Sequence, residues 1–453
     1  MIALPPELGW NPNPIVKLIS LKSYSYGRCQ VYSTKSILSS ILDTIVSLIL
    51  RWCFMLSEQA LLEILSDWSF WDEKPPIGLT RQLALPKQLH ADLALIIQGV
   101  RRSGKSTLLS QLPKHYRIPL TKCYYCNFED PRLMNNLDHK LLSRIVVLAR
   151  QKIPAGTNCY FFFDEIQNVE EWEKWIHTQL ERPKHNYFIL TGSNSRLLSG
   201  EFGTALTGRH ITLELFPFSY VEFKSLLPKN TLEDYLRSGG FPRPLTFDKP
   251  YQLLQEYFND IILRDVVKRV HARTPDSIKQ VAKMAFETCG SELSYRKIAA
   301  VTGLTVDTVK SYLEACEGAY LLFACNFFAF SEKKQLSKQK KYYPIDTGMR
   351  FAITNTTGSD LGKSLELIVY LRLKQTHEQV FYWHELHMGE VDFVAVTGKK
   401  IVPYQVTWNG PEPRHEKALQ HFYEHFPQAS EAVFITRKNA EAFLTGAINP
   451  VID

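Results

Sequence analysis

A glycine-rich segment that directly follows a short apolar run constrains the fold of this chain more than any other feature. Residues 93–98 read LALIIQ, and residues 99–107 read GVRRSGKST, which fits the pattern GxxxxGK[ST] without a mismatch. Residues 108–112 continue as a helix that we expect Pro113 to end. Strand, glycine loop and helix in this order predict a loop whose backbone N–H groups close around phosphate oxygens at the positive end of a helix.

The side chains of this loop predict a nucleotide site with ATP and Mg²⁺ as cofactors. Lys105 is expected to reach the β- and γ-phosphates, and the Ser106 hydroxyl is expected to ligate Mg²⁺. The remaining loop residues that we expect to contact ATP are Gly99, Arg101, Arg102, Ser103, Gly104 and Thr107.

Two adjacent carboxylates follow a second apolar run, CYFFFDE at residues 159–165. Ligands of parallel α/β sheets bind at the carboxyl ends of the strands, so Asp164 and Glu165 are expected beside the loop. Asp164 is predicted to hold the Mg²⁺ shell, and Glu165 is predicted to polarise the attacking water as the catalytic residue.

Two further candidate positions follow the next predicted strand, residues 187–190. Ser193 and Asn194 come directly after it and could sense the γ-phosphate or orient water, or they could simply close a turn. Arg209 ends the segment GTALTGR and is a candidate arginine finger, directed toward the nucleotide of its own chain or of a neighbouring subunit. The alternative is a solvated surface arginine.

Several segments, taken in order, resemble the AAA-type ATPases of bacteria and archaea that carry a C-terminal domain of unknown function. The segments are GVRRSGKSTLL, FFFDEIQNVEEWE, FILTGSNSRLL, LTGR, ELFPFSYVEF and RSGGFPRP. The resemblance covers about residues 60–450 and implies an α/β fold. It predicts an AAA-like P-loop core with a parallel sheet at 55–228, a helical lid at 229–288, a winged helix at 289–360, and a small endonuclease-like α/β domain at 361–453.

The predicted winged helix has two open interpretations. Residues 293–313 form a helix, a glycine-containing turn and a second helix capped by Thr305, and the apolar run 320–330 is the apparent wing. Five lysines follow between residues 333 and 341 and could contact DNA phosphates. However, the second helix offers only Lys310 as a base-reading cation, so a surface that contacts another domain or a protein partner is the favoured alternative.

The C-terminal domain resembles the metal-dependent PD-(D/E)xK-like endonuclease fold but departs from its pattern. Glu366, Asp392 and Gln405 match the first three positions, and Thr407 stands where the lysine should be. Gln405 offers one neutral oxygen instead of a carboxylate, which weakens Mg²⁺ binding. We therefore expect a degenerate binding or scaffolding domain and no active nuclease.

Composition limits the classes of protein to which this chain can belong. A net charge of +7 is mild for 453 residues, and 45% hydrophobic residues exclude a wholly disordered or fibrous chain. The eight cysteines include no paired CxxC motifs, so we predict reduced thiols in the cytoplasm.

Residues 1–54 form an extension that is either disordered or outside the translated chain, with Met55 as an alternative start. Its apolar run 37–50 contains Asp43 and is too short for a membrane span.

Two functions from different classes fit these observations. The first is a Mg²⁺-dependent ATPase that converts ATP and water to ADP and phosphate and thereby rearranges a DNA- or protein-binding C-terminal module, with oligomers possible. The second is a nucleotide-gated binding switch with negligible turnover. A Mg²⁺-dependent nuclease is a third interpretation.

Overall fold

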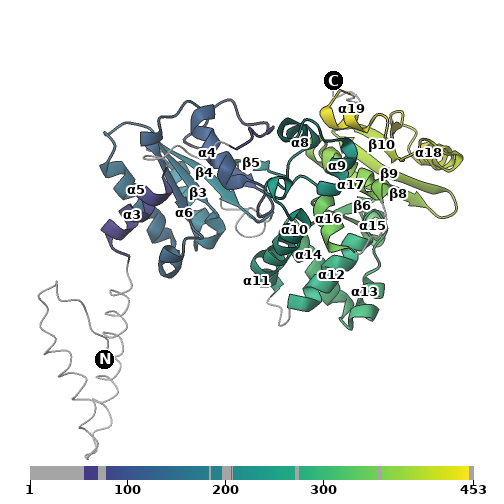
Figure 1. The fold of residues 1–453 in the computed structure, drawn as a ribbon, viewed down its shortest axis with the longest axis horizontal. Coiled ribbons are helices and arrows are strands. Elements are labelled where there is room, and N and C mark those ends of the chain that lie inside the picture. The colour runs from purple at the N-terminus through teal and green to yellow at the C-terminus, as the bar shows by residue number, and fades with distance from the viewer. Residues whose placement is uncertain are drawn as a thin grey trace, which may run out of the picture. The chain divides into compact units, whose positions relative to one another are not determined.

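The computed structural model describes residues 56–69, 78–182, 185–195, 206, 208–270, 275–354 and 360–447. The chain divides into two units, Met1–Leu56 and Ser57–Asp453. Every element below belongs to the second unit (Figure 1). The predicted extension at residues 1–54, with its apolar run, lies outside the described residues.

Five parallel strands form the first sheet, in the order β2-β3-β4-β1-β5. All residues of β1 are buried, as expected for a parallel sheet that is covered on both faces. This sheet confirms the predicted α/β core. Its strands are β1 (Ala94–Gln98), β2 (Cys123–Asn127), β3 (Cys159–Asp164), β4 (Asn186–Gly192) and β5 (His210–Glu214).

Helices α3 (Glu58–Trp68), α4 (Lys105–His115), α5 (His139–Gln151) and α6 (Trp172–Glu181) pack around this sheet (Figure 1). The prediction that Pro113 ends α4 is wrong, because the helix continues to His115. Pro113 lies in the last turn, where its missing N–H removes only one helical hydrogen bond, and its ring is buried.

The second sheet is mixed and has six strands in the order β11-β10-β9-β8-β6-β7. Strand β6 pairs with β7 on one side and with β8 on the other, so the predicted wing contains an interior strand of this sheet. The sheet therefore crosses the predicted boundary at residue 360. Its strands are β6 (Leu322–Phe327), β7 (Lys341–Pro344), β8 (Gln379–Glu385), β9 (Gly389–Thr397), β10 (Lys400–Val406) and β11 (Val433–Ile435).

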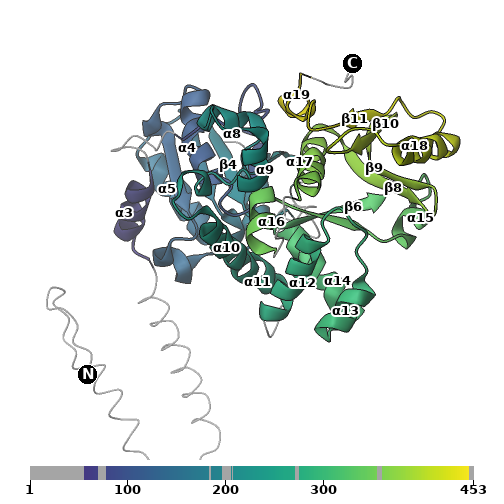
Figure 2. The ribbon, with the colours of Figure 1, turned by 45° about the vertical axis from the view of Figure 1, so that its right-hand side comes forward.

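The second sheet shares one hydrophobic core with the helices that follow the first sheet. The residues of this core range from Val100 to Leu444. Figure 2 shows these elements in teal, green and yellow. Helices α13 and α14 form the predicted helix pair, and Thr305 caps α14 by accepting a hydrogen bond from the Thr308 N–H. The helices are α8 (Tyr220–Leu226), α9 (Leu232–Ser238), α10 (Pro250–Ile261), α11 (Val267–Val270), α12 (Pro275–Glu287), α13 (Tyr295–Thr302), α14 (Val306–Gly318), α15 (Glu332–Ser337), α16 (Thr347–Ile353), α17 (Leu361–Thr376), α18 (Pro413–His425) and α19 (Ala440–Thr445).

A buried carboxylate explains the first glycine of the pair in RSGGFPRP. Asp346 caps α16 through the Met349 N–H at 2.7 Å and accepts the Gly240 N–H at 2.6 Å. A Cβ on Gly239 would lie 2.2 Å from Asp346 Oδ1, and the φ of Gly239 is +71°, so only glycine fits there. Burial raises the pKa of Asp346 to about 6. The loop after α9 is thus fixed to the start of α16.

Across the described ranges, no helix has the combination of length and apolar character that a membrane span requires.

Candidate nucleotide site

The glycine loop lies at the carboxyl end of the first sheet, between β1 and α4. The Gly99 N–H donates to the Gly192 carbonyl, so the ends of β1 and β4 are adjacent. Gly104 caps α4 with a φ of +99°, a conformation that other residues adopt only with strain. The Ser103 hydroxyl is buried and has no hydrogen-bond partner among the described residues. The loop therefore has the form of a phosphate-binding turn with an unused donor.

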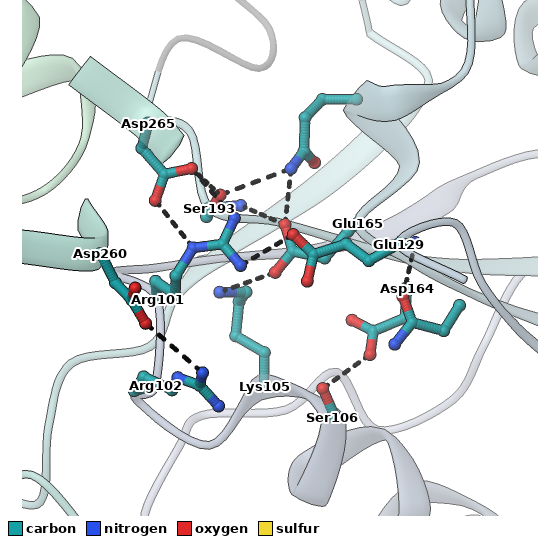
Figure 3. A network of polar contacts seen from close by, with 12 residues as sticks. Arg101, Arg102, Lys105, Ser106, Glu129, Asp164, Glu165, Ser193, Asp260 and Asp265 are labelled. Atoms are coloured by element: carbon teal, nitrogen blue, oxygen red, sulfur yellow. Dashed lines mark hydrogen bonds and ion pairs between the residues drawn. The ribbon is translucent and has the colours of Figure 1, made fainter. Parts of the chain in front are cut away.

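Four predicted side chains meet at this edge of the sheet (Figure 3). Lys105 Nζ lies 3.3 Å from Glu165 Oε1 and donates to the carbonyls of Gly99 and Val100. Ser106 Oγ donates to Asp164 Oδ2 at 2.6 Å. The structure thus brings together the residues that sequence spacing assigned to phosphates, metal and water.

Glu165 is held in a strained and charged environment. Its φ is +55°, which is uncommon for a residue with a side chain and is often found at functional sites. Gln167 Nε2 donates to Glu165 Oε2 at 2.5 Å, and the Ser193 N–H donates to the same oxygen at 3.2 Å. Burial opposes ionisation, but the Lys105 ammonium, Gln167 and Arg101 lower the pKa of Glu165 below its ordinary value. Glu165 is therefore an ionised hydrogen-bond acceptor.

Asp164 has the opposite electrostatic environment. Burial and the adjacent charge of Glu165 raise the pKa of Asp164 above its ordinary value. The hydroxyls of Ser106, Tyr125 and Thr191 donate to its two oxygens. Neighbouring carboxylates with pKa values moved in opposite directions are typical of sites where the two groups have separate tasks.

The oxygen donors fit Mg²⁺. This ion uses one or two protein oxygens and completes its octahedron with phosphate oxygens and water. Ser106 Oγ and Asp164 Oδ2 are such a pair. Within the described ranges, no group of three or more His, Cys, Asp or Glu side chains could hold a metal ion by itself.

Arg101 connects the loop to a distant part of the chain. Its guanidinium contacts both oxygens of Asp265, each at 3.1 Å, and Glu129 Oε1 at 2.7 Å. Ser193 Oγ also donates to Asp265, at 3.2 Å. Asp265 and Glu129 were not predicted as site residues, because neither belongs to a motif and Asp265 is 164 positions from Arg101.

The other predicted site residues have different positions. Arg102 is half-exposed, and its guanidinium lies 3.6 Å from Asp260. Asn194 lies two residues beyond the end of β4. Thr107 lies in the first turn of α4, against Gly78. Arg209 lies at the opposite end of β1, where its carbonyl accepts the Ala94 N–H and its guanidinium donates to the Leu180 carbonyl. The structure therefore does not bring Arg209 to the nucleotide site of its own chain.

A buried ion pair supports the loop from behind and was also missed. Arg81 is 6% exposed and Glu222 is 4% exposed, with 2.8 Å between Arg81 Nε and Glu222 Oε1. Arg81 also donates to the carbonyls of Ser103 and Phe216, at 2.8 and 2.7 Å. Glu222 lies in the segment ELFPFSYVEF, so this ion pair connects that segment to the glycine loop.

A second charged cluster lies in the C-terminal domain, and its cation is Lys341. Lys341 was expected in an exposed basic patch, but its side chain is fully buried and pairs with Glu390. Its ammonium also offsets the charges of Glu366 and Asp392, two of the predicted endonuclease-like positions. Thr407 donates to the Gly410 carbonyl. Burial raises the pKa of both Glu366 and Asp392.

Comparison with known families agrees with this arrangement. Residues 91–224 match the family described as AAA domain. Residues 229–360 and 361–452 match two domains of unknown function, DUF8612 and DUF4143. A protein of Haemophilus influenzae described as uncharacterized is 30% identical over 344 residues, which are 72% of this chain and 85% of that protein. The uncharacterized protein MJ1544 of Methanocaldococcus jannaschii is 31% identical over 353 residues, 72% of this chain and 77% of that protein.

The chain therefore belongs to the family of AAA-type P-loop ATPases with C-terminal domains of unknown function, a class of nucleotide-binding proteins. Solved structures show a remote likeness. Cdc6p from Pyrobaculum aerophilum has a TM-score of 0.24 and 12% identity over 67% of this chain and 90% of that chain. AMPPCP-bound DnaA from Aquifex aeolicus has a TM-score of 0.26 and 14% identity over 52% of this chain and 83% of that chain.

Proposed function

We propose that this protein is a Mg²⁺-dependent ATPase that couples the hydrolysis of ATP to a rearrangement of the parts that follow residue 228. The observation that supports the proposal is the meeting of a phosphate-binding lysine, a hydroxyl–carboxylate pair and an ionised carboxylate at one edge of a parallel sheet. These residues are Lys105, Ser106, Asp164 and Glu165.

Each residue has a separate role in this proposal. Lys105 exchanges the Gly99 and Val100 carbonyls for the β- and γ-phosphate oxygens. Ser106 and Asp164 hold Mg²⁺, which neutralises charge on the phosphates when bound. Glu165 orients the attacking water and accepts its proton, while Gln167 and the Ser193 N–H keep its carboxylate in place.

Phosphate release and calorimetry test this function. Glu165→Gln should bind MgATP but release phosphate about 10²–10⁴-fold more slowly, since a general base contributes a factor of that size. Lys105→Ala should lose nucleotide binding. Lys114→Ala, at an exposed lysine on the same helix, is the matched control and should behave like the parent. Folded parent protein that gives no binding heat with MgATP would refute the proposal.

The alternative is a nucleotide-gated switch with negligible turnover, which uses the same residues. A partner separates the two functions. Phosphate release that a partner accelerates and that Glu165→Gln abolishes supports the ATPase, and tight ATP retention with negligible release supports the switch. Mixing Arg209→Ala chains with Lys105→Ala chains tests whether a neighbouring subunit supplies the arginine finger. If it does, the mixture should release phosphate faster than either variant alone.

We propose that the later parts of the chain bind a protein partner and do not cut nucleic acid. Helix α14, the predicted recognition helix, has three acidic residues and one basic residue, Lys310, which lies 3.9 Å from Glu314. A recognition helix must lie in the major groove between two phosphate backbones, and the net negative charge of α14 disfavours that position. Salt-dependent binding of duplex DNA, or Mg²⁺-dependent cutting that Asp392→Ala abolishes, would contradict this part of the proposal.

A further inference from the structure

A π-helical turn lies where the second part of the chain meets the nucleotide site. Helix α10 ends at Ile261, residues Ile262–Val266 form the π-helical turn, and α11 continues from Val267. Such turns are rare and occur frequently at functional sites, because an extra residue changes the direction of the following side chains. Here the turn places Asp265, which is 9% exposed, toward the glycine loop.

Asp265 holds two different elements of the nucleotide site at once. Its two oxygens accept a fork of hydrogen bonds from Arg101 Nε and Nη2, both at 3.1 Å. Its Oδ1 also accepts the Ser193 hydroxyl at 3.2 Å, and the Ser193 N–H in turn donates to Glu165. Figure 3 shows Asp265 reaching Arg101 and Ser193 from the side opposite Glu165. One carboxylate therefore connects the loop, the end of β4 and the catalytic glutamate.

The partners of Asp265 are groups that also bind phosphate well. A guanidinium forms the same two-pronged contact with phosphate oxygens as with a carboxylate. A γ-phosphate beside Arg101 would place additional negative charge next to Asp265, Glu129 and Glu165, three carboxylates that already surround this guanidinium. Because like charges repel in a site with little water, Asp265 and the γ-phosphate compete for Arg101.

We propose that Asp265 is a positioning residue that holds Arg101 and Ser193 when no γ-phosphate is bound, and that ATP, but not ADP, displaces it. The exchange frees the turn after α10, so the occupancy of the γ-phosphate site changes the contacts of the helical part of the chain. This inference rests on the proposed nucleotide site and adds its link to the second part of the molecule.

Nucleotide affinities of Asp265→Asn test the competition. The asparagine side chain has nearly the same shape but removes the negative charge. If the contact is closed in about nine-tenths of the free molecules, its loss should tighten binding of a non-hydrolysable ATP analogue about tenfold and leave the Kd of ADP unchanged. The matched control is Asp260→Asn, which removes the same charge from the preceding helix α10, where Asp260 forms a half-exposed pair with Arg102 at 3.6 Å. The control should leave the ratio of the two affinities unchanged.

The ratio of ATP-analogue to ADP affinity distinguishes this role from a merely structural ion pair. An Asp265→Asn variant that weakens both ligands equally, or leaves both unchanged, would overturn the inference. Parent protein that binds neither nucleotide would instead contradict the proposed function itself.

A measurement on the parent protein keeps the inference testable if Asp265→Asn does not fold. Hydrogen–deuterium exchange of the amides in residues 262–270 should lose protection with the ATP analogue and keep it with ADP, each at saturation. Equal protection with both nucleotides would overturn the inference.

Discussion

Replacing Arg81 with alanine should destabilise the nucleotide-binding core by about 3 kcal/mol. Removing one partner of a buried ion pair typically lowers the free energy of unfolding by about 3–5 kcal/mol, since it leaves an uncompensated charge. Arg81 and Glu222 are 6% and 4% exposed, which places this pair in that class. The lower limit applies because the N–H groups of Gln82 and Ser219 still donate to the Glu222 carboxylate after Arg81 is removed.

Urea unfolding of matched variants measures this effect. Lys174→Ala is the control, because Lys174 and Glu171 form an ion pair of similar length whose side chains are 72% and 52% exposed. Exposed pairs contribute about 0–1 kcal/mol. Adding Glu222→Gln to Arg81→Ala should recover part of the loss, since the second change removes the buried charge. A loss for Arg81→Ala as small as that for Lys174→Ala would refute this reasoning.

Three further predictions concern other parts of the chain. Gly104→Ala should weaken ATP binding about tenfold or more in calorimetry, because the φ of +99° strains any side chain, whereas Gly362→Ala meets no atom within 4 Å and should not. Asp346 has a pKa of about 6 against an ordinary 3.8, so its contribution is complete below about pH 4 and is lost as the pH rises through 6. The parent should therefore lose about 2 kcal/mol relative to Asp346→Asn between pH 4 and 7 in urea unfolding, and parallel pH profiles would contradict this. Lys341→Met should lower the melting temperature more at pH 7.5 than at pH 5, because burial raises the pKa of Glu366 and Asp392 and the two groups carry less negative charge at the lower pH. Equal losses at the two pH values would contradict this prediction.

The nucleotide site could be predicted because two local rules are sufficient for it. The spacing of glycines and Lys105 specifies the loop, and the edge rule for parallel sheets brings Asp164 to Ser106 although 58 positions separate them. The apolar runs 93–98 and 159–165 are each long enough to define a buried strand. Local pattern and global topology agree here, so the prediction needed no knowledge of the remaining chain.

The partners that adjust this site could not be predicted, because no local pattern specifies them. Asp265 and Arg81 reach the loop from 164 and 22 positions away and belong to elements with their own packing. A helical period identifies α10 as amphipathic but does not reveal the π-helical turn that redirects Asp265. Pro113 is a further example, since the sequence does not reveal that its ring is buried in the last turn of α4, where the helix continues past it.

Lys341 shows how charge patterns mislead when a strand edge is not recognised. Its position in a run of lysines indicated a solvated patch, yet Lys341 begins β7, a strand whose residues are all buried. Its ammonium meets Glu390 of β9 from a segment that precedes the C-terminal domain. The cation of this cluster therefore comes from outside residues 361–453. The sheet is also shared, because β6 and β7 precede residue 361 and extend the sheet formed by β8, β9, β10 and β11. Residues 289–360 and 361–453 thus contribute strands to the same sheet, and both the hydrogen bonds of this sheet and the Lys341–Glu390 ion pair cross residue 360.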